Sequence, residues 1–302
     1  MDDSTKTPRV SRRRLMGMIA GGLTVSAVSG VGIYSQVRPD PVPQPSPVAA
    51  TVQSPAPKPD PAVRVETAEA TWYSWQWVNL TTGERYGSTN ATTETNNTES
   101  MIKAWIGTDY LTRLEKTGRP LTDADKTLIT KMIRLSDDGA AQTLWRRGGR
   151  DAVVQRAIDE CGLTGTAVYP DWWSKTQITA ADATTMMTCI LDRAKTSPLV
   201  AWLVDDLMRD VDPSNAFGIA EVLADVDAPA RPAVKNGWTA HGVTNQWNLN
   251  CLAQWRATGT RDDIVLAILT RYPVAKGQAY GEQLCRDVAR QLTDQLLPAS
   301  NT

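Results

Sequence analysis

Histidine is almost absent from the sequence: the 302 residues contain only one, His241. A metal site with several histidine ligands is therefore excluded, and a Ser–His–Asp triad would depend on this one side chain. His241 lies in the segment TAHGVTN, which is predicted to be the tip of a hairpin, and no G-x-S-x-G elbow occurs in the chain. These observations argue against a serine enzyme that uses histidine as its base.

The chain also lacks an excess of charge of either sign. Its 32 basic and 33 acidic residues leave a formal net charge of −1, so there is no basic field and we expect no nucleic-acid partner. The four cysteines stand singly, without the C-x-x-C spacing of a zinc site, and we expect no metal and no cofactor. With 41% hydrophobic residues, the chain can form one large or two small packed units.

The N-terminus is predicted to be an export signal that stays outside the fold. Three arginines, residues 12–14, precede the apolar run LMGMIAGGLTVSAVSGVGIYS, a pattern typical of the twin-arginine route. The small residues Val25, Ser26 and Ala27 suit a signal peptidase, but the apolar run continues past them. Cleavage and retention as an N-terminal anchor in contact with the membrane are therefore both open. A buried helix is the alternative interpretation of residues 1–36; as a signal, they predict an extracytoplasmic protein, secreted or anchored.

A proline-rich segment, residues 37–64, follows the predicted signal. In VRPDPVPQPSPVAATVQSPAPKPDPAVR the prolines recur so often that neither a helix nor a sheet ladder can form. The segment is predicted to be an extended, semi-rigid linker. It would hold the domain that follows, residues 65–298, away from a membrane or across a cell wall.

The folded domain begins with a strand pattern and ends with a helix pattern. TWYSWQWVNL alternates aromatic and polar residues, TTGE forms a turn and RYGS starts a return strand, which predicts a hairpin. Amphipathic helical segments follow, and then three strand patterns and a closing helix. This order predicts an α/β fold of the α+β type, an antiparallel sheet flanked by N- and C-terminal helices with an inserted all-helical lobe. The sheet lobe would comprise about residues 65–107 and 216–298, and the helical lobe about 108–215.

A serine and a lysine lie one turn apart at the start of the first long helix. In NNTESMIKAWIG, Ser100 follows a predicted N-cap, Thr98, where free N–H groups favour negative charge. Lys103 lies on the same face, and Met101 and Ile102 would bury the pair. Burial disfavours the ammonium form, so it lowers the pKa of a lysine and allows it to act as a base. One S-x-x-K can also occur by chance, so the other parts of a site are needed.

Two further polar clusters follow in the sequence. Ser136-Asp137-Asp138 interrupts a helical run, and Lys235-Asn236-Gly237 lies in the first of the late strands. In this order the three clusters resemble the S-x-x-K, S-x-N and K-[ST]-G boxes of the serine β-lactamase and penicillin-binding protein superfamily, and of its class A β-lactamases in particular. The resemblance covers about residues 65–298. Taken singly, the second cluster could be a helix N-cap and Lys235 a solvated charge at a sheet edge.

The resemblance implies a role for each polar residue of the three boxes. Ser100 would form an acyl-enzyme with Lys103 as its base, and Ser136 would pass a proton to the leaving nitrogen. Lys235 would supply positive charge for a carboxylate of the substrate. The backbone N–H groups of Ser100 and Trp238 would form the oxyanion hole.

The sequence departs from the family pattern on the substrate side. Asp138 replaces an asparagine, which exchanges an amide that can donate for a carboxylate that only accepts, and Asn236 replaces a hydroxyl residue. Together with Gly237 and Trp238, these residues would contact the substrate. The two departures from the family pattern therefore leave the identity of the substrate open. The best-known lactam-hydrolysing class has a deacylating glutamate after the second box. Here that segment offers Asp171, one methylene shorter, and its other interpretation is a turn residue after a proline.

Tryptophan is frequent, with 11 residues in the chain. A carbohydrate-binding surface is one interpretation, but Trp75, Trp77, Trp105 and Trp202 fit the apolar faces of their predicted elements and are assigned to the core. The pair Trp172-Trp173 does not follow such a face, and it is predicted to line the site.

The cysteines are predicted to pair, because an exported chain meets an oxidising compartment. Cys161 and Cys189 would form a disulfide within the helical lobe, and Cys251 and Cys285 one across the sheet lobe. Four buried free thiols are the alternative, since periodicity does not establish the separation of the Cα atoms.

These observations predict a serine hydrolase that forms an acyl-enzyme at Ser100 with a β-lactam or with the D-alanyl peptides of peptidoglycan. The partner would be such a small molecule, and we expect a monomer. The first alternative is a D,D-peptidase or transpeptidase-like enzyme, and the second is a non-catalytic domain that binds the cell wall or senses β-lactams. The loop offers only Asp171 as a deacylating base, and Lys103 or the carboxylate of Asp138 are the alternatives, so we expect slow turnover and a long-lived adduct but not a dead enzyme.

Overall fold

The computed structural model describes residues 63–67, 71–226, 231–256 and 262–297. The predicted export signal and residues 37–62 of the predicted linker lie outside these ranges. Within them, no helix combines the length and the apolar character that a membrane crossing requires.

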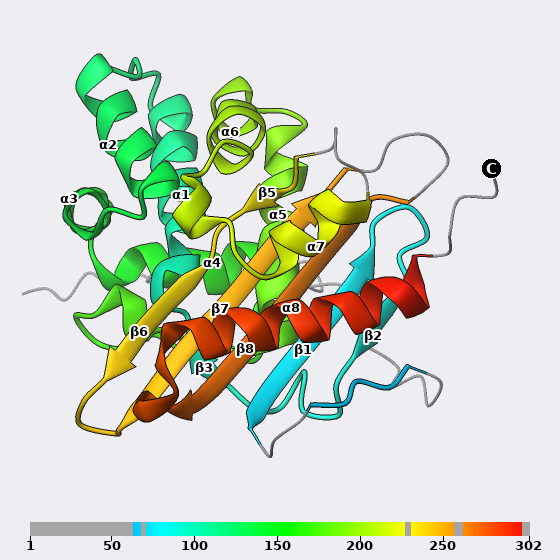
Figure 1. Cartoon of the computed structure of the whole chain (residues 1–302). Helices are drawn as coiled ribbons and strands as arrows, with labels where there is room; N and C mark the ends of the chain where they lie inside the picture. Colours follow the sequence, from blue (N-terminus) through cyan, green and yellow to red (C-terminus); the bar gives the residue numbers. More distant parts are fainter. Residues whose placement is uncertain (1–62, 68–70, 227–230, 257–261, 298–302) are drawn as a thin grey trace, which may run out of the picture. The chain divides into compact units, whose positions relative to one another are not determined.

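A twisted antiparallel sheet forms the centre of the folded unit (Figure 1). Its strands lie in the order β2, β1, β8, β7 and β5, and β6 also pairs with β7. Their bounds are β1 Trp72–Asn79, β2 Arg85–Gly87, β5 Ala233–Val234, β6 Gly237–His241, β7 Gln246–Trp255 and β8 Ile264–Pro273. The hairpin predicted from the aromatic N-terminal stretch is confirmed, because β1 pairs with β2 in antiparallel register.

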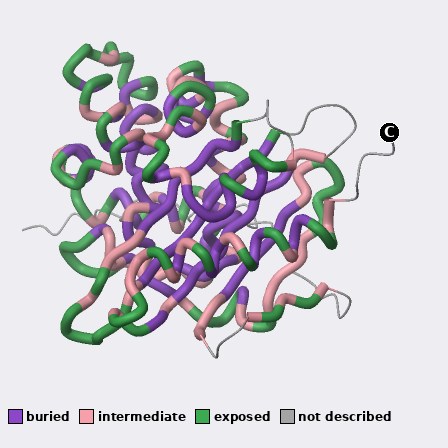
Figure 2. Tube along the Cα trace, viewed as in Figure 1, coloured by how far each residue is buried: buried purple, intermediate pink, exposed green. Residues whose placement is uncertain are grey.

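Helices cover both faces of the sheet. On the face toward the viewer of Figure 1 lie α7 (Ile219–Val226) and the C-terminal α8 (Gly277–Leu296), while α5 (Ala180–Ala194) packs on β1 and β8 from behind. Trp77 and Trp255 are almost fully buried on the α7–α8 side, and Figure 2 shows that the sheet is the most continuously buried part of the molecule. No helix precedes β1 in the residues that the structure describes, so of the N- and C-terminal helices expected to flank the sheet only the C-terminal one, α8, is present there.

The remaining helices form the inserted lobe that the sequence predicted. They are α1 Lys103–Lys116, α2 Asp123–Arg134, α3 Asp138–Arg147, α4 Asp151–Cys161 and α6 Pro198–Trp202, which continues as a π-helical turn at Leu203–Met208. The capping signals agree with the sequence. Thr122 and Asp125 form a reciprocal capping box at the start of α2, and Gly162 ends α4 in the left-handed conformation that glycine adopts without strain.

Three local details differ from the sequence prediction. Thr98 makes no capping hydrogen bond, and its hydroxyl donates to the carbonyl groups of Trp173 and Ser174. The segment after residue 216, expected to contain only strands before the closing helix, includes α7. The predicted strand around Lys235-Asn236 is interrupted at these two residues, which lie between β5 and β6.

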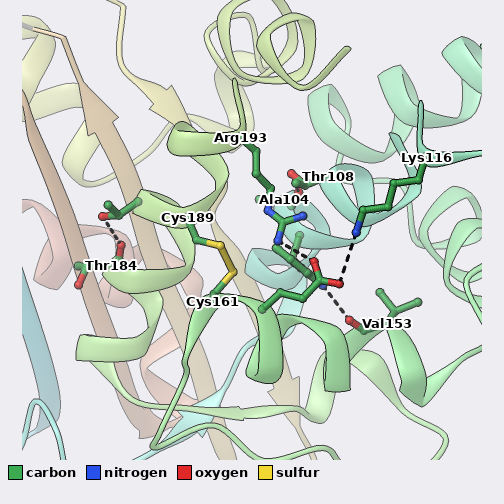
Figure 3. Close-up of a disulfide and its surroundings, with 11 residues drawn as sticks. Ala104, Thr108, Lys116, Val153, Cys161, Thr184, Cys189 and Arg193 are labelled. Carbon is green, nitrogen blue, oxygen red and sulfur yellow. Dashed lines mark hydrogen bonds and ion pairs between the residues drawn. A yellow bond between two sulfur atoms is a disulfide. The ribbon is translucent and has the colours of Figure 1, made fainter. Parts of the chain in front are cut away.

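The cysteine predictions divide into one that is confirmed and one that is wrong. Cys161 at the end of α4 and Cys189 in α5 form a disulfide, with their Cα atoms 5.6 Å apart (Figure 3). Cys251 in β7 and Cys285 in α8 are buried free thiols. These two side chains lie next to each other beside Gly218. They are therefore neighbours, as the predicted pairing requires, but no disulfide joins them.

Candidate active site

Ser100 lies in a tight turn between the sheet and the helical lobe. A 3₁₀ turn, Glu99–Ile102, leads directly into α1, which begins at Lys103. Glu99 has a φ of 47°, a left-handed conformation that costs a non-glycine residue about 1–3 kcal/mol. The surrounding structure must hold this turn in place, and it leaves the Ser100 side chain partly accessible at the wall of a cavity.

Lys103 is fully buried, as the sequence predicted. Its Nζ donates to Asp138 Oδ1 at 2.6 Å, to the Ser136 carbonyl, and to Ser136 Oγ at 3.3 Å. Burial lowers the pKa of Lys103, while the hydrogen bond and the charge of Asp138 oppose this shift. The structure therefore brings the first two polar clusters together through one ammonium group.

The second cluster combines a structural residue with two residues that face Lys103. Asp137 is the N-cap of α3 and accepts a hydrogen bond from Ala140 N, so a capping role holds for this residue. Ser136 has a φ of 55° just before the cap, and Asp138 is the first residue of the helix. The Asp138 side chain is 80% exposed even though it pairs with a buried lysine.

Lys235 meets the second cluster from the opposite side. Its Nζ donates to Ser136 Oγ at 2.9 Å and to the Asn236 carbonyl at 3.0 Å, and the residue is 1% exposed. Burial, together with the nearby positive charge of Lys103, holds the pKa of Lys235 well below its usual value. A solvated edge charge, the other interpretation of Lys235, is therefore wrong. One serine hydroxyl, that of Ser136, lies between two buried lysines.

The Asn236 side chain faces into the fold. Its Nδ2 donates to the carbonyl oxygens of Asn215 at 3.1 Å and Phe217 at 2.9 Å, and its Oδ1 accepts from Leu252 N at 3.2 Å. These bonds use both amide hydrogens and the amide oxygen, and they stabilise the break between β5 and β6. Asn236 therefore offers no side-chain donor to the cavity. The hydroxyl residue that the family pattern has at this place would be expected to offer one.

Gly237 allows β6 to pass directly against the turn that carries Ser100. A Cβ atom at this position would lie 2.6 Å from Ser100 N, 2.6 Å from Met101 N and 2.7 Å from Thr98 O, closer than real Cβ contacts. Only glycine fits without moving backbone. Trp238, the next residue, reaches the cavity, and its ring packs edge-on against Phe217 with the ring centroids 5.2 Å apart.

The cavity in front of Ser100 has a volume of about 490 Å³. Residues from both lobes line it: Glu99, Ser100, Asp138, Gly139, Gln142, Asp171, Trp172, Trp173, Ser174, Trp238 and Thr239. The prediction that Trp172-Trp173 lines the site is confirmed. Trp173 is 7% exposed and donates to Gln142 Oε1 at 3.0 Å, whereas Trp172 is 53% exposed at the rim, with Lys175 Nζ 4.3 Å from its ring centroid.

Asp171 lies at the rim of the cavity with its carboxylate already engaged. Its Oδ1 is 2.8 Å from Arg150 Nη2, and its backbone N donates to the carboxylate of Asp151. The φ of 59° agrees with the turn interpretation of this residue. Among the residues that the structure describes, including those around Asp171, no group of three acidic, histidine or cysteine side chains is placed to hold a metal ion.

Sequence reasoning gave no role to Glu99 or His241, and the structure brings the two together. His241 ends β6, and its Nε2 is 2.6 Å from Oε1 of Glu99, which is 1% exposed. Asn248 Nδ2 donates to the same oxygen at 3.3 Å. The sequence contained one signal for His241: the only histidine of the chain lies four residues after Gly237, the last residue of the third polar cluster.

The geometry can support acyl transfer. A serine hydroxyl opens onto a cavity, a buried amine of lowered pKa follows one turn later, and a second hydroxyl lies within 3.3 Å of two lysine nitrogens. Such a chain of hydrogen bonds can accept a proton from one atom and deliver it to another. No imidazole is needed for this chemistry.

The family model of the beta-lactamase enzyme family matches residues 124–296. Among curated proteins, the putative lipoprotein LppW of Mycobacterium tuberculosis (strain H37Rv) and that of Mycobacterium bovis are each 31% identical over 159 residues. This match covers 49% of the present chain and 49% of each relative, so the chain spans about half the length of the curated relatives it matches.

Solved structures with the same fold include three proteins of low sequence identity. The TLA-3 extended-spectrum beta-lactamase has a TM-score of 0.63 and 11% identity, over 76% of this chain and 94% of that one. PBP-A has a TM-score of 0.61 and 17% identity, over 76% and 91%. A beta lactamase from Xanthomonas campestris pv. campestris has a TM-score of 0.60 and 17% identity, over 74% and 92%. At these identities the likeness concerns the fold.

Proposed function

Because the chain belongs to the beta-lactamase enzyme family, we propose that it is a serine hydrolase that forms an acyl-enzyme at Ser100. The Ser100 oxygen attacks the carbonyl of a β-lactam or of a D-alanyl peptide, the carbonyl–nitrogen bond breaks, and the acyl group remains on the serine. Lys103 takes the hydroxyl proton, and Ser136 delivers a proton to the leaving nitrogen. The N–H groups of Ser100 and Trp238 stabilise the oxyanion.

One observation carries this proposal: Ser136 Oγ lies 3.3 Å from Lys103 Nζ and 2.9 Å from Lys235 Nζ, with both lysines buried. Burying two ammonium groups without a use for them is costly, because an ion in a low-dielectric interior loses its hydration. In the proposed mechanism Lys103 accepts the proton of Ser100, and the contacts of Ser136 with the two lysines pass a proton on to the leaving nitrogen. A pure binding domain would have no need for it, which argues against the non-catalytic alternative.

The substrate side of the site differs from the family pattern in a way that affects anchoring. Lys235 already donates to two oxygens, and the Asn236 amide is turned into the fold. A carboxylate of the substrate would therefore meet fewer free donors than a K-[ST]-G box would give it. This arrangement supports a D-alanyl peptide or a β-lactam bound mainly through contacts with Trp172 and Trp238.

Deacylation is proposed to be slow. The one carboxylate on the expected loop, Asp171, is held by Arg150 at 2.8 Å, and its side chain is 70% exposed. A displacement of about 1 Å from the productive position can cost of the order of 10²-fold in rate. Stopped-flow hydrolysis of nitrocefin should show a burst followed by a shallow steady state. Hundreds of turnovers per second without a burst would show that an efficient deacylating base exists.

We further propose that the protein acts outside the cytoplasm, exported by its twin-arginine segment and either released or anchored. The curated relatives are described as lipoproteins, which supports an extracytoplasmic place for the family. The present chain has no cysteine within or directly after its apolar N-terminal run, so its anchor, if retained, would be the run itself.

The test is covalent labelling of the full chain with a fluorescent penicillin. The native protein should give a denaturation-resistant fluorescent band, and Ser100→Ala should give none. Ser174→Ala is the matched control, because Ser174 lines the same cavity without a lysine one turn later, and this variant should still form the adduct. Labelling that survives in Ser100→Ala would refute the assignment of the nucleophile. Hydrolysis of acyl-D-Ala-D-Ala compared with that of penicillin then separates a D,D-peptidase from a lactamase.

A further inference from the structure

A buried carboxylate and the only histidine of the chain form a direct contact behind the proposed oxyanion hole. Glu99 Oε1 and His241 Nε2 are 2.6 Å apart, and the two residues are 142 positions apart in the sequence. The contact joins the nucleophile turn to the end of β6, and a carboxylate oxygen there accepts the hydrogen of Nε2 in the tautomer that carries it. Asn97 Nδ2 lies 3.3 Å from the same Nε2, so the imidazole also meets the segment just before the turn.

The two ends of this contact belong to the two segments that carry the proposed oxyanion donors. Glu99 directly precedes Ser100, and His241 lies three residues after Trp238 on the same strand. The segments also touch at Gly237, where a Cβ atom would lie 2.6 Å from Ser100 N. Two attachments, one at each end of β6, therefore set the distance between the two N–H groups.

The backbone at Glu99 shows that the turn needs such an attachment. Its φ of 47° is a strained conformation for glutamate, and a turn of this kind relaxes unless its neighbours hold it. Asn248 of β7 also donates to Glu99 Oε1, at 3.3 Å, but β7 carries neither proposed donor. His241 is the residue that connects the strained turn to the strand of Trp238.

We propose that Glu99 and His241 are positioning residues that hold the N–H groups of Ser100 and Trp238 at the spacing that a tetrahedral oxyanion requires. This inference rests on the proposed acyl-enzyme function and adds to it two residues that act through the backbone of the nucleophile turn and of β6. An oxyanion hole acts in the transition state and little in the ground state. Loosening the contact therefore slows acylation without weakening the initial, non-covalent binding of substrate.

The experiment compares His241→Ala with His241→Gln in the full chain. Three quantities are measured: the acylation rate constant with a fluorescent penicillin, the dissociation constant of the non-covalent complex that precedes it, and the affinity for a boronic acid. A boronic acid accepts the Ser100 oxygen at boron while the hydroxyl proton passes to Lys103, and the tetrahedral boronate places an oxygen where the oxyanion would lie. Its affinity thus reports on the oxyanion hole independently of lactam chemistry.

His241→Ala should lower the acylation rate and the boronate affinity together, by about 10²-fold each, and leave the non-covalent dissociation constant within about twofold. His241→Gln should recover most of both losses, because its amide N–H can donate to Glu99. Val243→Ala, a change at a fully exposed side chain in the turn after β6, is the matched control and should resemble the native protein. A merely structural role would not give parallel losses in these two quantities with rescue by glutamine.

The outcomes separate the two proposals. If the native protein forms no adduct with lactam or boronate, the proposed function is wrong. If it forms both and folded His241→Ala matches it, the positioning role alone is wrong. If His241→Ala does not fold, His241→Leu decides, because it fills the space of the imidazole and has no N–H to donate to Glu99. It should lose rate and boronate affinity in parallel, and an unchanged rate would overturn the inference.

Discussion

Replacing Asp138 by asparagine should increase the fraction of Lys103 that is neutral and able to take a proton. Asp138 Oδ1 lies 2.6 Å from Lys103 Nζ, and its hydrogen bond and negative charge raise the pKa of a lysine that burial would otherwise lower further. Asparagine keeps the shape of the side chain and removes the charge. The pKa of Lys103 should fall, so more of the amine is neutral at a given pH.

The size of the effect follows from the exposure of the two partners. A hydrogen bond to a charged group contributes about 1.5–3 kcal/mol, but Asp138 is 80% exposed and solvent screens its charge. We therefore take about 1–2 kcal/mol for the stabilisation of the ammonium form. Since about 1.4 kcal/mol is a factor of ten, acylation below the pKa of Lys103 should rise by about 5–30-fold.

The assay is the acylation rate of native protein and Asp138→Asn with a fluorescent penicillin across a range of pH. A group whose pKa falls becomes neutral at lower pH, so the acid limb of the profile should move toward lower pH in the variant. At high pH, where Lys103 is neutral in both proteins, the two rates should converge, which serves as an internal control. A rate ratio that does not change with pH, or a slower variant throughout, would refute the assignment of Lys103 as the base.

Three further predictions concern other parts of the structure. Lys103→Ala should slow acylation by about 10²–10⁴-fold, the usual worth of general-base help, and labelling at the native rate would exclude this role. Gly237→Ala should abolish labelling in a protein that still folds, because the added Cβ must displace the backbone N of Ser100; normal labelling would show that β6 does not need this close approach. Thiol counting on denatured, unreduced protein should find two free groups, and loss of the disulfide by Cys161→Ala should lower the free energy of unfolding by about 3–4 kcal/mol, the loop-closure value for a separation of 28 residues. Four free thiols, or an unchanged urea midpoint, would contradict the assigned Cys161–Cys189 bond.

The sequence predicted the order of strands and helices because the patterns concerned are local. Capping residues such as Thr122 and Gly162, and the alternation in β1, depend on neighbours a few positions away. The burial of Lys103 also followed from its own turn, where apolar residues flank it. The three polar clusters converge in space as their shared order suggested, through Ser136 Oγ.

What the sequence could not provide depends on contacts between distant segments. The alternation in β1 does not reveal that its polar side is covered too: Gln76 is buried and accepts a hydrogen bond from Thr184 of α5. The inward orientation of Asn236 requires the carbonyl groups of a loop about twenty positions earlier. The contact between Glu99 and His241 joins two residues that no local pattern relates.

The Cys251–Cys285 prediction failed for a similar reason. The side chains lie in contact, as the crossing of β7 and α8 suggested, but a disulfide also requires the correct separation and direction of the two Cβ atoms. Burial further raises the pKa of the Cys251 thiol and disfavours the thiolate that would form the bond.

The most direct test of the account is to map the adduct that a penicillin forms with the full chain. After brief incubation, denaturation and proteolysis, mass spectrometry should find the added mass of one intact penicillin on the peptide that contains Ser100, and the fragment ions should place it on that serine. An adduct on another residue, or no adduct with any β-lactam or D-alanyl ester, would contradict the claim that this protein forms an acyl-enzyme at Ser100.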